Sequence, residues 1–164
     1  MLKLALPILF KVRPAMVYEM IRKQMAGSVP YATHTGVELV SIGDGRAEAL
    51  LPDRPEVKNH IGSQHAGALF TLGETASGGA MAGAMAPVLL SVRPVAANAR
   101  IAYTKVAKGP IRALARVDAD SAALRATLEA DGKVRFDVAV DLLDEGGETV
   151  ATMAVEWHVS KKRG

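Results

Sequence analysis

The sequence predicts an α+β fold in which a curved antiparallel sheet wraps around one long central helix, with an extra helix at the N-terminus. Residues 65–86 form a run of small and apolar residues whose only charged member is Glu74. Segments that alternate between apolar and polar residues come before and after this run. Strands and helices do not alternate along the chain, which argues against a doubly wound parallel sheet.

The composition is that of a globular domain without disulfides. The chain has 164 residues, of which 49% are hydrophobic and 23% charged, so we expect one domain with a hydrophobic core. The absence of cysteine excludes a thiol nucleophile and is compatible with a cytoplasmic location. The net charge of +3 would favour an anionic substrate but is too small and scattered to indicate nucleic-acid binding.

The N-terminal residues predict a helix over 3–26. Its apolar residues recur at helical spacing, and Pro7 followed by Lys11 departs from the pattern of a signal peptide. We expect an N-terminal helical extension, 1–30, that covers the main domain, 31–160; contact with a membrane surface is the alternative. Residues 161–164 are expected to be a solvated basic tail.

The central region predicts a hairpin followed by the long helix. Strands are expected over 37–42 and 46–51, because Gly43-Asp44-Gly45 between them is typical of a hairpin turn. The helix over 65–86 is long enough to span a bilayer. Its many Ala, Gly, Thr and Ser residues instead favour burial at the centre of a soluble fold.

The C-terminal half predicts three or four further strands. Alternation with a period of two covers four ranges: 97–104, 111–119, 134–142 and 149–159. Glycine-containing turns separate the first pair and the last pair. Residues 121–130 fit either a helical insert or part of a strand connection.

Glu74 and the start of the central helix are the residues with a potential for chemistry. A carboxylate among apolar residues has a raised pKa unless it is paired, and the energetic cost of burying it usually indicates a function. The alternative is that Glu74 lies at the helix surface and is hydrogen-bonded to a neighbour. The first N–H groups of the helix, beginning at Ala66, can polarise a carbonyl oxygen. Ala66 and Glu74 lie roughly 12 Å apart along the helix, so both reach one substrate only if two helices pair antiparallel in a two-fold dimer.

The segment 59–76 resembles the active-site segment of hotdog-fold thioesterases of the phenylacetate-pathway, PaaI-like type. In that family an Asn or Gln precedes a His-Gly-Gly at the helix start, and an acid follows nine residues after the His. Asn59, His65 and Glu74 match in type and spacing. Residues 101–109 and 144–157 resemble the family's tyrosine-containing strand and its final hairpin. The chain also resembles an uncharacterised hotdog subgroup.

The resemblance implies hydrolysis of an acyl-CoA or similar thioester, with coenzyme A as part of the substrate and no cofactor or metal. The Ala66 N–H would bind the thioester oxygen, and Glu74 of the partner chain would act as nucleophile or general base. Asn59 would orient the water or the thioester, and His65 would shape the helix start. We expect other substrate contacts from Gly67, Thr75, Ser77, Lys105 and Lys108. The two lysines would contact the phosphates of coenzyme A.

Two departures from the family pattern leave other functions open. Ala66 replaces a glycine, and Gly78 stands where some related enzymes carry a hydroxyl group that holds water. One alternative is therefore a non-catalytic protein that binds acyl-CoA or lipid. The other is a dehydratase that acts on enoyl or hydroxyacyl thioesters through His65. The sequence also leaves open the length of the acyl chain, whether the thioester is one of coenzyme A or of a carrier protein, and whether the protein is a dimer or a tetramer.

Overall fold

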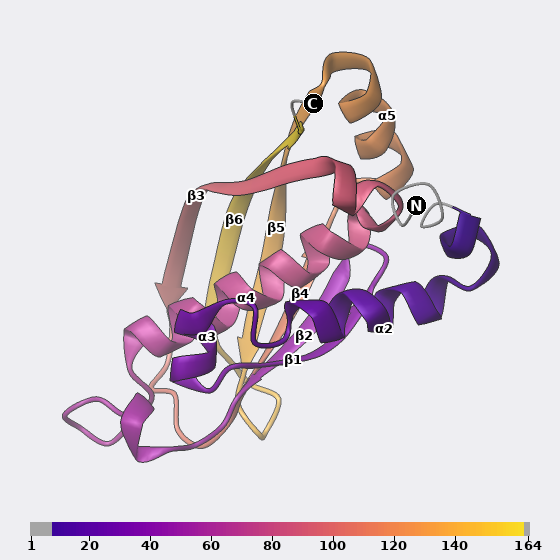
Figure 1. Cartoon of the computed structure of the whole chain (residues 1–164). Coiled ribbons are helices and arrows are strands. Elements are labelled where there is room, and N and C mark those ends of the chain that lie inside the picture. The colour runs from indigo at the N-terminus through magenta and orange to yellow at the C-terminus, as the bar shows by residue number, and fades with distance from the viewer. Residues whose placement is uncertain (1–7, 163–164) are drawn as a thin grey trace.

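The computed structural model describes residues 8–162 and consists of one antiparallel sheet, a long helix against it and smaller helices around them (Figure 1). Residues 8–12 form a short helical segment. The elements that follow are α2 (Pro14–Met25), α3 (Pro30–Thr35), β1 (Glu38–Gly43), β2 (Arg46–Leu51), α4 (Ala66–Ala84), β3 (Val92–Tyr103), β4 (Ile111–Val117), α5 (Ser121–Asp131), β5 (Lys133–Leu143) and β6 (Thr149–Lys161), with 3-10 turns at Pro55–Val57 and Ala86–Ser91.

The sheet has six strands in the order β1-β2-β4-β5-β6-β3, and α4 contacts every one of them. All neighbouring strands run antiparallel. Alternate residues of β6, including Met153 and Trp157, are buried on the face that meets the helix. The expected sheet around a central helix is therefore confirmed.

Glycines let α4 lie close to the sheet. A Cβ on Gly79 would stand 2.8 Å from the Cβ of Ala47, and a Cβ on Gly83 would overlap the carbonyl oxygen of Gly43 at the end of β1. Gly78, on a different face of the helix, has room: its Cβ would lie 3.6 Å from the indole of Trp157. Close packing of α4 on the sheet therefore depends on Gly79 and Gly83 but not on Gly78.

The substitution Gly83→Ala is expected to lower the free energy of unfolding by about 1–3 kcal/mol, because the backbone of β1 must shift to admit the methyl group. Gly78→Ala is the matched control. It should be neutral or stabilising, since Ala gains up to about 1 kcal/mol of helix propensity over Gly. Denaturant unfolding of the two variants beside the wild type measures the difference. Equal stability of all three proteins would contradict the proposed close contact.

The N-terminal helix is interrupted, contrary to the continuous helix predicted over 3–26. Arg13 adopts φ −141° and ψ 66° immediately before Pro14, because proline disfavours the helical conformation of the residue that precedes it. Residues 3–7 of the prediction lie outside the described residues. A second short helix, α3, was not predicted; it begins with Pro30 and ends at Gly36, which adopts φ 75°.

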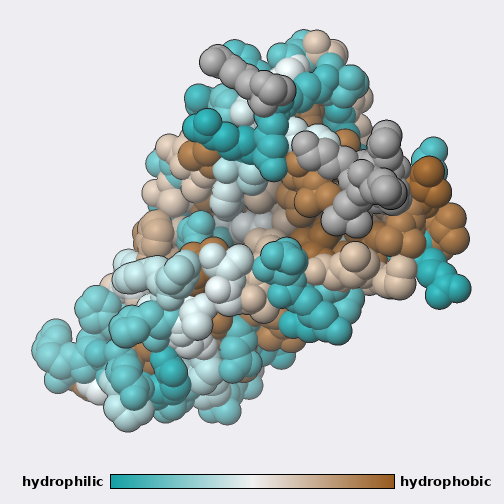
Figure 2. All heavy atoms as spheres, viewed as in Figure 1, coloured by the Kyte–Doolittle hydropathy of each residue, from teal (hydrophilic) through white to brown (hydrophobic). Residues whose placement is uncertain are grey.

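The N-terminal helices cover the edge strand β1 and one side of α4. Helix α2 contacts both β1 and α4, and α3 contacts α4. In Figure 1 both lie on the viewer's side of α4, with the sheet behind it. Apolar side chains remain exposed along this region: Ile8, Val12, Met16 and Met20. Figure 2 shows brown, hydrophobic surface on the side of the molecule where Figure 1 places the N-terminal helices. None of the helices among residues 8–162 has the length and apolarity needed to cross a membrane.

Two other boundaries differ from the sequence predictions. Strand β3 begins at Val92, five residues before the predicted start, and includes Pro94. The undecided segment is helix α5, whose first turn is capped by the Asp120 side chain, which accepts from the N–H of Ala123 at 2.7 Å. Of the predicted basic tail, Lys161 is the last residue of β6, and residues 163–164 lie outside the described residues.

Candidate active site

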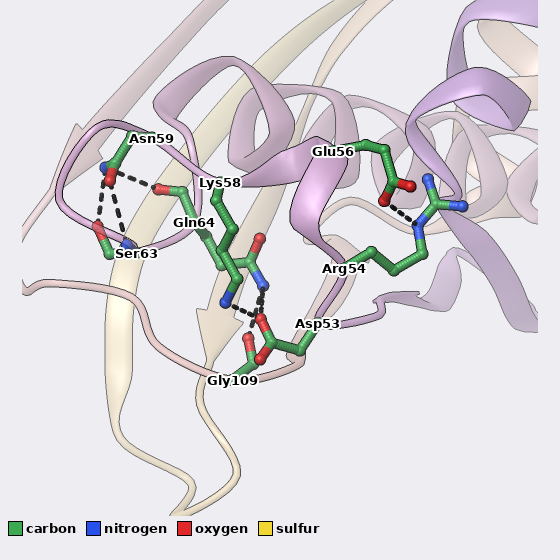
Figure 3. Close-up of polar contacts among 8 residues, drawn as sticks. All are labelled: Asp53, Arg54, Glu56, Lys58, Asn59, Ser63, Gln64 and Gly109. Atoms are coloured by element: carbon green, nitrogen blue, oxygen red, sulfur yellow. Dashed lines mark hydrogen bonds and ion pairs between the residues drawn. The ribbon is translucent and has the colours of Figure 1, made fainter.

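A network of polar side chains holds the loop that leads into α4 (Figure 3). The side-chain amide of Gln64, which is buried, donates to Oδ1 of Asp53 at 3.1 Å and to the carbonyl oxygen of Gly109 at 2.7 Å. Lys58 forms an ion pair with the same Asp53. Two loops that are far apart in sequence are thereby joined beneath the start of the helix.

Asn59 directs its side chain into its own loop (Figure 3). Its Oδ1 accepts from the N–H groups of Ile61 and Ser63, both at 3.1 Å, and its Nδ2 donates to Oγ of Ser63 at 2.8 Å. The amide therefore fixes the loop that precedes the helix. The water-orienting contribution implied by the resemblance stays a prediction.

His65 and Ala66 form the first positions of α4. His65 is the N-cap residue, and its Nδ1 accepts from the N–H of Gly67 at 2.9 Å. Because Nδ1 accepts, a donor hydrogen of the ring lies on Nε2, for which no acceptor is found among the described residues. The N–H of Gly67 is therefore occupied by the cap, whereas the N–H of Ala66 has no acceptor among the described residues.

Tyr103, at the end of β3, also fixes the start of α4. Its hydroxyl donates to the carbonyl oxygen of Ala66 at 2.9 Å. The sequence placed Tyr103 on a strand but assigned it no contribution to the site. A tyrosine 37 positions from its partner has no local signal that would reveal this contact.

Glu74 lies two turns further along α4, in the wall of a cavity of about 810 Å³. Its carboxylate has no hydrogen bond or ion pair to any residue in the described part of the chain. Partial burial among apolar groups raises the pKa of Glu74 above the usual value for a glutamate. The expected isolated acid is thus present in the structure.

The cavity lies between α4 and the N-terminal helices. Glu74, Thr75, Gly78 and Met81 line it from α4. Residues from α2, α3, β1, β3, β6 and the loop after β2 complete the wall, among them Arg22, Met25, Val37, Leu39, Arg54, Pro94 and Trp157. None of these seven was a predicted site residue, because only the tertiary fold brings the N-terminal helices to Glu74.

The remaining predicted substrate contacts are placed differently. Ser77 is completely buried; its hydroxyl donates to the carbonyl oxygen of Glu74 at 2.7 Å and accepts from the indole N–H of Trp157 at 3.3 Å. Direct contact with a substrate is not open to it. Lys105 is exposed and forms an ion pair with Glu148 at 2.9 Å, and Lys108 is exposed in the next turn. Among residues 8–162, no three His, Cys, Asp or Glu side chains cluster in a way that could hold a metal ion.

Comparison with known proteins places the chain in a structural context. A family model described as a domain of unknown function (DUF4442) matches residues 18–159. No protein of curated function matches the chain in sequence. A solved Pseudomonas aeruginosa protein of unknown function, described as a "probable thioesterase", is 28% identical with a TM-score of 0.75, and the match covers 88% of this chain and 95% of that chain.

Two further solved structures show the same fold. A conserved Pseudomonas aeruginosa protein is 27% identical with a TM-score of 0.69, over 84% of this chain and 98% of that chain. The Escherichia coli PaaI protein from the phenylacetic acid degradation operon is 18% identical with a TM-score of 0.71, over 92% of this chain and 96% of that chain. The expected hotdog fold and the similarity to PaaI are confirmed.

Proposed function

The chain belongs to the family described as a domain of unknown function (DUF4442), and on that premise we propose that it hydrolyses acyl-CoA or similar thioesters. The observation that carries the proposal is Glu74, an unpaired carboxylate with a raised pKa in the wall of a large cavity. The thioesterase description of a structural relative at 28% identity supports the same reaction class. The hotdog fold alone would not, since one fold serves many functions.

In the proposed reaction Glu74 accepts a proton from a water whose oxygen attacks the thioester carbonyl carbon. The free N–H of Ala66, at the positive end of α4, donates to the oxyanion that develops. When the carbon–sulfur bond breaks, the proton held by Glu74 passes to the coenzyme A thiolate. Coenzyme A enters as part of the substrate, and the exposed Lys108 is the better candidate of the two lysines for its phosphates, because Lys105 is already paired.

We infer that the two groups meet across a dimer. Ala66 and Glu74 are separated by roughly 12 Å on one rigid helix, so the Glu74 of one chain must face the Ala66 of another. Strand β3 offers an edge for this pairing. It hydrogen-bonds only to β6 among the described strands, and its Val95 and Tyr103 side chains are 46% and 47% exposed. The outer edge of such a strand presents backbone N–H and C=O groups that can pair with another chain.

A thiol-release assay over acetyl-, octanoyl-, palmitoyl- and phenylacetyl-CoA tests the proposal. We expect turnover of at least one of these thioesters. Tight binding of acyl-CoA without any release would favour the non-catalytic alternative, and hydration of crotonyl-CoA would favour the dehydratase.

The pH dependence of kcat/KM gives a second test. A base acts only when it is ionised, so the rate should rise with pH through the pKa of Glu74. Because burial raises that pKa, the midpoint of the acid limb should lie above the ordinary value for a glutamate. A rate that stays constant from pH 4 through pH 8, in a range where the protein remains folded, would contradict the assignment of Glu74 as base.

A further inference from the structure

The cavity beside Glu74 extends along α4. Of the four residues that line it from this helix, Glu74, Gly78 and Met81 follow one another at intervals of four and three and therefore lie on one face, with Thr75 next to Glu74. Seven residues separate Glu74 from Met81, which corresponds to about 10 Å of helix. The cavity thus extends two turns from the acid towards the C-terminus of α4, and this part of it is called the channel.

The wall beyond Glu74 is apolar and adaptable. Met25 of α2 and Met81 of α4 contribute flexible thioether side chains, and Leu39 contributes a branched aliphatic one. Trp157 presents its ring, because its N–H is turned to Ser77. Gly78 forms the floor, where a Cβ would lie 3.6 Å from Trp157 and 3.9 Å from Met25.

The two arginines of the wall are already engaged by other groups. The guanidinium of Arg22 donates twice to Glu19, both at 2.7 Å, and once to the carbonyl oxygen of Leu39 at 3.2 Å. The guanidinium of Arg54 donates to the carbonyl oxygen of His34 at 3.3 Å and lies 4.0 Å from the Glu56 carboxylate. Each guanidinium therefore already contacts a carboxylate and a carbonyl oxygen of the chain, although Nε of Arg54 has no hydrogen-bond partner among the described residues.

We propose that this channel binds the acyl chain of the substrate and that Gly78, midway between Glu74 and Met81, keeps it open, so that unbranched aliphatic acyl groups of medium length are preferred. The inference rests on the proposed thioester hydrolysis. An extended chain advances roughly 3.5 Å over three bonds, so a channel of about 10 Å accepts about eight or nine bonds. The N-terminal helices form its outer wall and thereby act as a specificity element.

The test compares kcat/KM for straight-chain acyl-CoAs from acetyl to palmitoyl in the wild type and in Gly78→Leu. In the wild type we expect kcat/KM to rise with chain length up to about eight to ten carbons. In Gly78→Leu the leucine occupies the middle of the channel. We expect octanoyl-CoA to lose roughly 10–200-fold in kcat/KM, while acetyl-CoA stays within about threefold. Ala126→Leu, on the exposed face of α5 away from the cavity, is the matched control and should keep the wild-type profile.

Met25→Ala gives an independent variant on the opposite wall if Gly78→Leu does not fold. It widens the channel and should move the optimum towards longer chains. A wild-type rate that falls steadily from acetyl to octanoyl, a preference for phenylacetyl-CoA, or equal losses at all chain lengths in Gly78→Leu would overturn the inference while leaving thioester hydrolysis intact. Failure of the wild type to hydrolyse any thioester would overturn both.

Discussion

Glu74→Gln is expected to lower kcat for thioester hydrolysis by about 10²–10⁴-fold, the usual contribution of a positioned general base. The amide keeps the size of the carboxylate but cannot accept a proton from water. Glu74 is the only charged residue of α4, so the helix offers no second base. Steady-state thiol release with the best substrate of the wild type measures the loss.

The stability of Glu74→Gln separates a lost base from a lost fold. A carboxyl group whose pKa is raised by folding is more favourable when neutral, and its contribution to stability is lost as the pH rises through the folded pKa. Glutamine is neutral at every pH and therefore removes the cost of ionising a buried carboxyl group. At neutral pH, thermal unfolding of the variant should thus occur at the wild-type temperature or higher. Glu129→Gln, the same change on the surface helix α5, is the control and should retain wild-type activity. A fully active Glu74→Gln enzyme would exclude the proposed base.

Ala66→Pro is expected to lower kcat by about 10²–10³-fold, because it removes one donor to the oxyanion. Proline has no N–H, yet it is well tolerated at the first position of a helix, which is where Ala66 stands. The preceding His65 has φ −68° and ψ 139°, a conformation that a following proline favours. The variant therefore deletes the donor while keeping α4 intact, which circular dichroism would verify. Wild-type kcat in the folded variant would assign the oxyanion contact elsewhere.

Mixing the two inactive variants tests whether each site combines two chains. In a heterodimer of Glu74→Gln and Ala66→Pro subunits, one site carries both defects and the other carries neither. Random exchange of equal amounts should therefore restore about a quarter of the wild-type activity if the assembly is a two-fold dimer. Sites contained within one chain would give no recovery, because every chain in the mixture lacks one of the two groups.

The strands and the central helix could be predicted because their signals are local. Gly43-Asp44-Gly45 predicted the turn between β1 and β2, and the alternation of residues placed Met153 and Trp157 of β6 towards the core. The start of α4 at Ala66 followed from the residues around it. The continuous N-terminal helix was wrong, because the interruption at Pro14 outweighed the apolar spacing on both sides.

The sequence by itself determined the order of the elements and an isolated acid on a helix of small residues. Only the tertiary structure decided which of those residues face the sheet and which face the cavity. Gly79 and Gly83 meet β2 and β1, while Gly78 opens towards Trp157, because a turn of 3.6 residues sends neighbouring positions to different sides. Likewise, Ser77 is buried and accepts a hydrogen bond from Trp157, which is 80 positions away in the sequence. The N-terminal helices reach Glu74 only in the folded chain.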